Sequence, residues 1–141
     1  MYKLSIMKKK LNSVLLVDDD DATNFIHKYV IEEAEFAKNI KVVENGQEAL
    51  DYLKSNNDSG YERPNLIFLD INMPVMDGWE FLEHYKQLDK ELQGHIMVVM
   101  ITTSLNPDDK QHAESLGIID HFMSKPLTVD MLKELQLNIF A

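Results

Sequence analysis

Cysteine is absent from the 141-residue sequence, and this absence excludes a disulfide framework and any thiol chemistry. Basic residues are scarce as well. The chain has 14 Lys and Arg against 24 Asp and Glu, a formal charge of −10 that repels a phosphate backbone. We therefore expect protein partners and no nucleic acid.

Long hydrophobic runs are also missing. No stretch approaches the roughly 20 apolar residues that a membrane span requires. The lysine-rich start from Met1 to Lys10 is followed by the short apolar run Val14 to Val17 and then by four aspartates, which does not fit a secretory signal. We expect a cytoplasmic protein without membrane insertion.

Five short apolar runs recur along the chain and predict β-strands. They are Val14–Val17, Ile40–Val43, Leu66–Leu69, Met97–Ile101 and His121–Met123. Three are almost uninterrupted, as in parallel strands that are covered on both faces. Segments with helical spacing lie between them and carry apolar stripes, the first of which contains Phe25, Ile26, Tyr29 and Val30.

The alternation of strands and helices predicts an α/β fold, a doubly wound five-stranded parallel sheet with five helices. We expect residues 1–11 to be an N-terminal extension and residues 12–138 to be the domain, with no output domain attached. Capping residues support the helices: Asn106 before Pro107, Gly117 after the fourth helix, and Thr128 before the last one. The stretch from Ser55 to Asn65 is predicted to be an exposed loop.

Polar residues stand at the ends of four of the predicted strands. They are Asp18 and Asp19, Asp70, Thr102, and Lys125. Ligands of doubly wound sheets bind beyond the carboxyl ends of the strands, so these side chains are predicted to share one pocket. Clustered carboxylates repel unless a cation compensates, and oxygen ligands suit Mg²⁺. Lysine and threonine opposite a reactive carboxylate suit phosphoryl transfer.

Each piece has an ordinary structural interpretation when it stands alone. An acidic run is commonly a solvated loop or helix start, a strand-end Asp or Thr is commonly a cap, and Lys-Pro is commonly a turn. The combination of spacing, strand context and shared face makes the functional interpretation the stronger one.

Four motifs resemble the response-regulator receiver family, typified by the chemotaxis response regulator, across residues 12 to 138. The motifs are Val14–Asp20, Leu69–Gly78, Met100–Ser104 and Phe122–Pro126. The resemblance implies the flavodoxin-like receiver fold and a phosphoacceptor in a two-component phosphorelay. It also implies that the protein is no classical enzyme, since it catalyses only its own phosphorylation and dephosphorylation.

The resemblance also implies roles for single residues. Asp70 would take the phosphoryl group, Asp19 would bind Mg²⁺ directly, and Asp18 would act through a bound water. The main-chain carbonyl of Asn72 would complete the metal shell. Donors would be a histidine kinase or a histidine phosphotransfer protein, acting ahead of a downstream protein target.

The remaining implied roles concern signalling. Thr102 would hydrogen-bond the phosphoryl group, and Lys125 would pair with it. Phe122 would either rotate as Thr102 moves or be an ordinary core aromatic, because it lacks the hydroxyl of a tyrosine. Such a rotation would shift the face made by the fourth helix, fifth strand and fifth helix. The resemblance further predicts a cis Lys125–Pro126 bond.

Some positions depart from the family or leave the interpretation open. Thr103 stands where the family often has a smaller residue, and Asn72 and Ser104 are in positions expected to tune hydrolysis. Asp20 and Asp21 would either tighten cation binding or belong to the start of the first helix, and we favour the helix start.

Two other classes of function share parts of this pattern. A dehalogenase-type phosphatase needs a second acid two residues after the nucleophile, where this chain has Asn72. A docking module that is never phosphorylated predicts a damaged pocket, whereas every expected residue is present. Within the favoured class, a diffusible regulator, a phosphorelay shuttle and a phosphate sink remain open.

Partner surfaces are less clearly indicated. The helix with Phe25, Ile26 and Tyr29 is where partners of the family dock, but its apolar side is expected mostly to face the sheet. Trp79, Phe81 and Leu82 are expected to be core residues.

Overall fold

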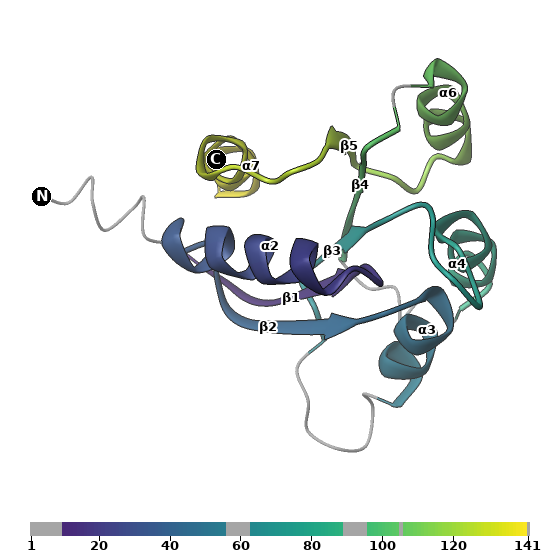
Figure 1. The fold of residues 1–141 in the computed structure, drawn as a ribbon, viewed down its shortest axis with the longest axis horizontal. Helices are drawn as coiled ribbons and strands as arrows, with labels where there is room; N and C mark the ends of the chain where they lie inside the picture. Colours follow the sequence, from purple (N-terminus) through teal and green to yellow (C-terminus); the bar gives the residue numbers. More distant parts are fainter. Residues whose placement is uncertain (1–9, 56–62, 89–95, 105, 141) are drawn as a thin grey trace, which may run out of the picture.

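The computed structural model describes residues 10–55, 63–88, 96–104 and 106–140. Within them, five strands form one parallel sheet of order β2-β1-β3-β4-β5 (Figure 1). The strands are β1 (Leu11–Val17), β2 (Ala37–Val43), β3 (Leu66–Leu69), β4 (Met97–Thr102) and β5 (His121–Ser124). All five predicted strands are confirmed, as is the doubly wound α/β fold.

In the described residues one helix follows each of these strands. The helices are α2 (Asp21–Glu33), α3 (Gly46–Ser55), α4 (Gly78–Tyr85), α6 (Pro107–Leu116) and α7 (Val129–Phe140). The predicted caps are confirmed: the Asn106 side chain accepts from the amide of Asp108, Gly117 ends α6 in the left-handed region, and Thr128 Oγ1 accepts from the amide of Met131. Most of the predicted loop before β3 lies outside the described residues.

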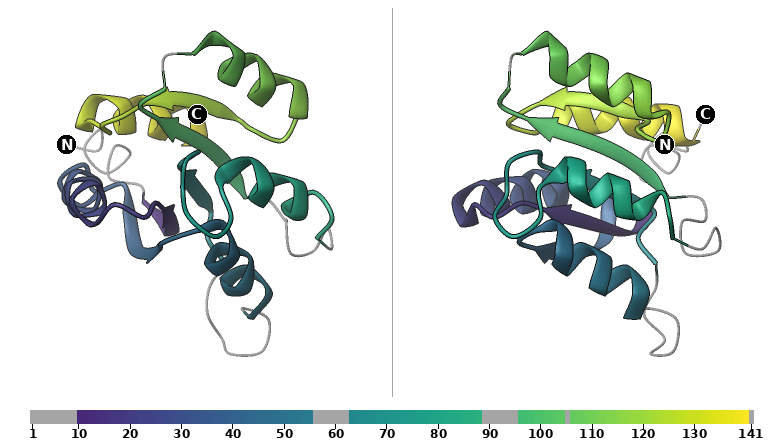
Figure 2. Two further views of the ribbon diagram at one scale, coloured as in Figure 1. Left: turned by 45° about the vertical axis from the view of Figure 1, so that its right-hand side comes forward. Right: turned by 90° about the vertical axis from the view of Figure 1, so that its right-hand side faces the viewer.

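The helices form two layers with the sheet between them. Helices α3, α4 and α6 lie on one face, seen from the front in the right-hand view of Figure 2, and α2 and α7 cover the other. Alternate residues of β1 enter different clusters: Leu15 packs with α3 and α4, whereas Leu16 packs with α2 and α7. Burial on both faces explains why the central strands are apolar without interruption.

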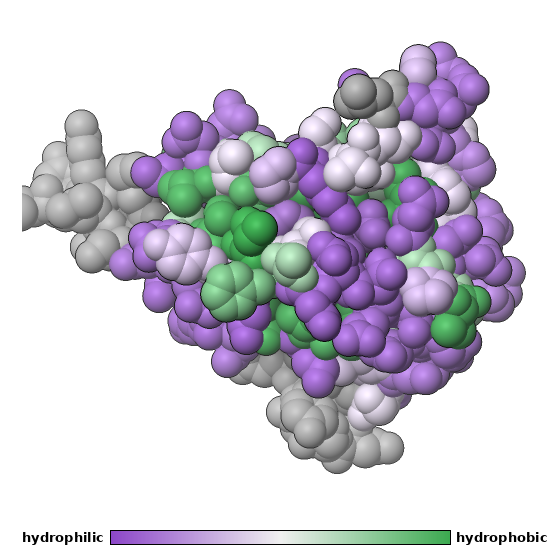
Figure 3. Space-filling view, viewed as in Figure 1, coloured by the Kyte–Doolittle hydropathy of each residue, from purple (hydrophilic) through white to green (hydrophobic). Residues whose placement is uncertain are grey.

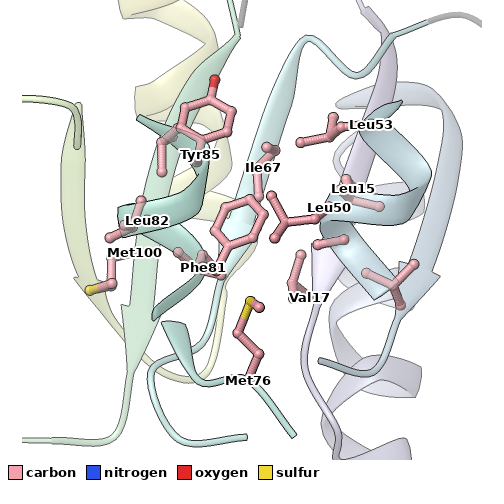
Figure 4. Packing of buried hydrophobic residues seen from close by; sticks show 14 of the residues in the cluster. Leu15, Val17, Leu50, Leu53, Ile67, Met76, Phe81, Leu82, Tyr85 and Met100 are labelled. Carbon is pink, nitrogen blue, oxygen red and sulfur yellow. The ribbon is translucent and has the colours of Figure 1, made fainter. Parts of the chain in front are cut away.

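The cluster beneath α3 and α4 is the larger apolar core. Figure 4 shows the ring of Phe81 among Ile67, Leu50 and Met76, with Tyr85 one turn farther along α4. Phe81 and Tyr85 stack with ring centroids 5.6 Å apart. The expectation that Phe81 and Leu82 are core residues is confirmed, while Trp79 is partly buried against the same cluster.

Helix α2 contradicts one expectation. Its apolar stripe was expected mostly to face the sheet, but Phe25 is 76% exposed, Tyr29 is 59% exposed, and Ile26 is also exposed. The residues of α2 that are buried are Asn24, His27 and Ile31. The physical reason is local: the first turns of α2 adjoin the polar ends of the strands, where hydrogen-bonding side chains are needed.

The boundaries of the elements extend the expected domain slightly. β1 already begins at Leu11, whose amide donates to the carbonyl of Phe36, and α7 continues to Phe140. The domain boundaries at residues 12 and 138 stay a prediction, because the first strand and the last helix extend one and two residues beyond them. None of the described helices is long and apolar enough to cross a bilayer.

Candidate functional site

The predicted site residues lie together at the carboxyl edge of the sheet. Main-chain hydrogen bonds continue the strand pairing one residue beyond the strands. The amide of Asp18 donates to Val43, that of Asp70 to Val17, and that of Lys125 to Thr102, at 2.9 to 3.1 Å. These bonds fix three side chains from β1, β3 and β5 at one edge.

Lys125 bridges two of the carboxylates. Its Nζ lies 2.5 Å from Oδ2 of Asp18 and 3.3 Å from Oδ1 of Asp70. Both aspartates are buried, at 4% and 7% exposure. Buried charges require partners, so this ion-pair network is the local means of holding two acids out of water.

One lysine does not compensate for all the negative charge. Carboxylate oxygens of Asp18, Asp19 and Asp70 all lie within 4.8 Å of one another, and Asp19 is exposed. Burial and the charge of Asp18 raise the pKa of Asp70, although Lys125 opposes the shift. This uncompensated repulsion, with a set of hard oxygen donors, fits a divalent cation.

The pKa of Lys125 reflects the same balance. Burial disfavours its charged form, but the hydrogen bond to Asp18 and the charges of Asp70 and Asp18 outweigh burial and raise the pKa. The ammonium therefore stays protonated beside the carboxylates. A fixed positive charge is thus available next to Asp70.

The other predicted residues lie on the strands and loops that carry this centre. Thr102 ends β4 and is buried, and its Oγ1 accepts a hydrogen bond of 3.0 Å from the amide of Ser104. Asn72 lies on the exposed loop after Asp70, and Phe122 is half-buried on β5, opposite Met100. The described contacts thus join Asp18, Asp70 and Lys125 directly, while Thr102 is held by the loop that follows it.

The loop after Asp70 closes tightly against Gly78. The amide of Gly78 donates to the carbonyl of Ile71 at 2.8 Å, and a Cβ on Gly78 would lie only 2.4 Å from the carbonyl oxygen of Asp70. Asp77 and Glu80 then form a capping box that starts α4. Gly78 is the last residue of the motif Leu69–Gly78, but only the structure shows why it must be glycine.

The extra aspartates belong to the helix, as we favoured. Asp20 is the N-cap of α2, and its carboxylate accepts hydrogen bonds from the amide and hydroxyl of Thr23. These bonds lower the pKa of Asp20. Asp21 is the first residue of the helix, where an acid interacts favourably with the helix dipole.

Two residues of α2 that sequence reasoning missed also contact the site. Nδ2 of Asn24 donates to the carbonyl of Asp18 at 2.8 Å, and Nε2 of His27 accepts from the amide of Leu127 at 3.3 Å. Their spacing of three residues, which puts them on one face of a helix, was the available signal. The predicted cis Lys125–Pro126 bond is confirmed.

A cavity of about 220 Å³ adjoins Lys125. Residues of α2 and of the loops after β4 and β5 line it, namely Thr23, Ile26, His27, Thr103, Lys125 and Pro126. It lies on the α2 side of the site.

A parallel sheet of this order, with acids and a lysine at its carboxyl edge, defines the class of receiver proteins. The family model described as the response regulator receiver domain matches residues 14–136. The chain belongs to this family.

Curated relatives agree with this assignment. The chain is 33% identical over 120 residues to the probable methanogenesis regulatory protein FilR2 of Methanothrix harundinacea, covering 85% of this chain and 76% of the relative. It is 34% identical over 90 residues to sporulation initiation phosphotransferase F of Bacillus subtilis, covering 64% of each protein.

Solved structures are similar as well. A two-component response regulator from Cytophaga hutchinsonii matches with a TM-score of 0.83 and 34% identity, covering 94% of this chain and 98% of that one. The Mn²⁺-bound form of response regulator Rcp1 matches with a TM-score of 0.70 and 29% identity, covering 91% of each chain. The chain is a phosphoacceptor response regulator, and its acidic pocket suits a divalent metal.

Proposed function

We propose that Asp70 is the phosphoacceptor of a two-component phosphorelay and that Mg²⁺ is its metal. The observation that carries this proposal is the position of the Asp70 carboxylate, 3.3 Å from Lys125 Nζ and inside the cluster with Asp18 and Asp19. Asp19, Asp18, Asp70 and the carbonyl of Asn72 would hold the ion, which neutralises charge on the phosphoryl oxygens when bound.

The chemistry assigned to Asp70 is a nucleophilic displacement. A carboxylate oxygen of Asp70 forms a bond to phosphorus while the bond from phosphorus to the imidazole nitrogen of a phosphohistidine breaks. The imidazole leaves with the electron pair and takes up a proton. Lys125 pairs with the phosphoryl oxygens, and Thr102 donates a hydrogen bond to them. The donor would be a histidine kinase or a histidine phosphotransfer protein in the cytoplasm.

The signal would leave through the loop after β4. In the structure, Thr102 Oγ1 accepts from the amide of Ser104, and the Ser104 hydroxyl donates to Asp109 of α6 at 2.6 Å. When Thr102 turns toward a phosphoryl group, this connection would move the start of α6. Phe122 would then rotate into the space that Thr102 leaves. The face of α6, β5 and α7 would change for a downstream protein target.

The exposed apolar face of α2 supports a docking site for the donor protein. Figure 3 looks onto this side of the molecule and shows apolar side chains gathered over the region of α2 and α7. Phe25, Ile26 and Tyr29 are exposed on α2, close in sequence to the site-contacting Asn24 and His27. An apolar helix face of the phosphohistidine donor would cover them.

The similarity to a phosphotransferase of sporulation initiation favours a relay role as a second candidate. In that role Asp70 would pass its phosphoryl group on to a histidine of another protein. Return of the phosphoryl group from the isolated phosphorylated chain to a histidine phosphotransfer protein would support the relay over the diffusible regulator or phosphate sink.

Intact-mass analysis after incubation with acetyl phosphate tests the phosphoacceptor. We expect one base-labile phosphoryl adduct on the native chain with Mg²⁺, and none with EDTA or on Asp70→Asn. Asp51→Asn is the matched control, because Asp51 is an exposed acid on α3 that bonds Gln47. Lack of an adduct on the native chain would favour the constitutive docking module.

The docking site is tested by comparing two donors. Phe25→Ser and Tyr29→Ser should slow phosphoryl transfer from a histidine kinase that phosphorylates the native chain, about tenfold or more if they are central to the interface. Phosphorylation by acetyl phosphate should be unchanged. Leu137→Ser, on the exposed side of α7, is the control. Equal transfer to all variants would place the donor elsewhere.

A further inference from the structure

His27 is a buried ionisable residue to which the proposed chemistry assigns no part. It is 2% exposed and lies on the side of α2 that faces the sheet. A buried imidazole needs a hydrogen-bond partner, and an apolar residue would fill the position at lower cost if packing were the only requirement. The hydrogen-bond partner of His27 therefore indicates what the residue does in the structure.

That partner is the main chain immediately after Lys125. Nε2 of His27 accepts the hydrogen bond of 3.3 Å from the amide of Leu127. Residue 126 is proline and has no N–H, so Leu127 carries the first main-chain donor after Lys125. His27 thereby joins α2 to the segment that carries the lysine, 100 residues away in sequence.

The charge state of His27 suits this contact. Burial and the positive charge of Lys125 lower its pKa, while Asp18 acts in the opposite direction. The imidazole is thus neutral near pH 7, and an acceptor nitrogen is available for the amide. Its other nitrogen then carries the proton.

A second contact of α2 holds the other end of the ion pair. One turn earlier, Asn24 donates to the carbonyl of Asp18 at 2.8 Å. The same two turns of helix therefore hold both Asp18 and the segment of Lys125. The distances of Nζ to Asp18 and Asp70, 2.5 and 3.3 Å, depend on how these two segments are placed.

We propose that His27 is a positioning residue for phosphorylation, which fixes the Lys125 ammonium between Asp18 and Asp70 by accepting the amide of Leu127. This inference rests on the proposed function of Asp70. In this proposal the buried side of α2 positions a reacting group, whereas the exposed side carries the apolar residues Phe25 and Tyr29.

Two substitutions separate positioning from packing. His27→Gln keeps an acceptor at the end of the side chain, whereas His27→Leu fills the space without one. Ile31→Val, one turn farther along the buried side of α2, is the control for a mild packing loss. Urea unfolding of each variant measures how much stability is lost.

The readout is the rate of adduct formation on Asp70 with acetyl phosphate and saturating Mg²⁺. We expect His27→Leu to be slowed about tenfold, because a small misplacement of a charged group that acts on the transferred phosphoryl is costly. His27→Gln should recover most of the native rate, and Ile31→Val should match it. In parallel, hydrogen exchange at the Leu127 amide should be faster in His27→Leu and protected in His27→Gln.

Several results would overturn the proposal. One is adduct formation at the native rate in folded His27→Leu. Another is adduct formation in His27→Gln that is as slow as in His27→Leu. If His27→Leu does not fold, ¹⁵N spectra of the native chain decide, because the proposal requires the proton on Nδ1 and a proton on Nε2 contradicts it. Lack of any adduct on the native chain would instead refute the proposed function, so the two failures are distinguishable.

Discussion

Helices α4 and α2 lie on opposite faces of the same sheet and use their apolar residues in opposite ways. α4 buries Phe81, Leu82 and Tyr85 completely or almost completely. α2 buries Ile31, but it also buries the polar Asn24 and His27 and exposes Phe25 and Tyr29. The amphipathic pattern predicts the orientation of α4 correctly and that of α2 wrongly.

The difference follows from what each helix covers. α4 packs against an apolar cluster, so burial of apolar surface decides its orientation. The first turns of α2 adjoin Asp18 and the segment after Lys125, whose main-chain groups need partners. The comparison teaches that the site, and not the hydrophobic pattern alone, orients α2.

The sharpest test compares one aromatic from each helix. Phe81→Ala should lower the free energy of unfolding by about 3–5 kcal/mol, since it leaves a cavity in the core. Phe25→Ala should change it by less than about 0.5 kcal/mol, as at other exposed positions. Urea unfolding measures both. Similar losses of unfolding free energy in the two variants would mean that Phe25 is packed like Phe81, and would contradict the difference between the two helices.

Gly78 tests whether α4 also supports the site. In Gly78→Ala the new Cβ would meet the Asp70 carbonyl, so we expect a loss of about 1–3 kcal/mol and slower adduct formation on Asp70. Gly117→Asn is the control for backbone strain without a clash, because no atom lies within 4 Å of a Cβ there and asparagine adopts the left-handed conformation more readily than other residues with a side chain. An unimpaired Gly78→Ala would show that the close approach relaxes freely.

The stability of the fold is expected to depend on alkaline pH through α4 and on acidic pH through α2. Burial and the charge of Asp120 raise the pKa of Tyr85 on α4 to about 12. In the unfolded chain the Tyr85 hydroxyl loses its proton near pH 10. The protonated hydroxyl therefore contributes its full stabilisation below pH 10, and this stabilisation is lost as the pH rises toward 12. Tyr85→Phe should remove this loss at alkaline pH.

His27 on α2 should respond to acid instead. Its folded pKa is lowered, so the unfolded chain binds the proton first once the pH falls below about 6.5, and stability declines from there. His27→Gln should lack this decline. Urea midpoints of the native chain and of both variants across the pH range measure the two effects. Native-like pH dependence in either variant would contradict the corresponding assignment.

The strands and the site residues were predictable because their signals are local. Runs such as Leu66–Leu69 are apolar throughout because both faces of a central strand are covered. Asp18, Asp70 and Lys125 follow strand ends, and parallel strands bring those ends to one edge. The caps Asn106 and Gly117 were predictable for the same reason, since a cap acts within one turn.

The sequence by itself thus determined the order of strands and helices and the gathering of acids and a lysine at one edge of the sheet. Only the tertiary structure decided that α2 turns Asn24 and His27 inward, and that Gly78 must leave room for the Asp70 carbonyl. These features depend on contacts between segments far apart in sequence. An unpaired main-chain group or a close atomic approach exists only once those segments meet, so no local pattern records it.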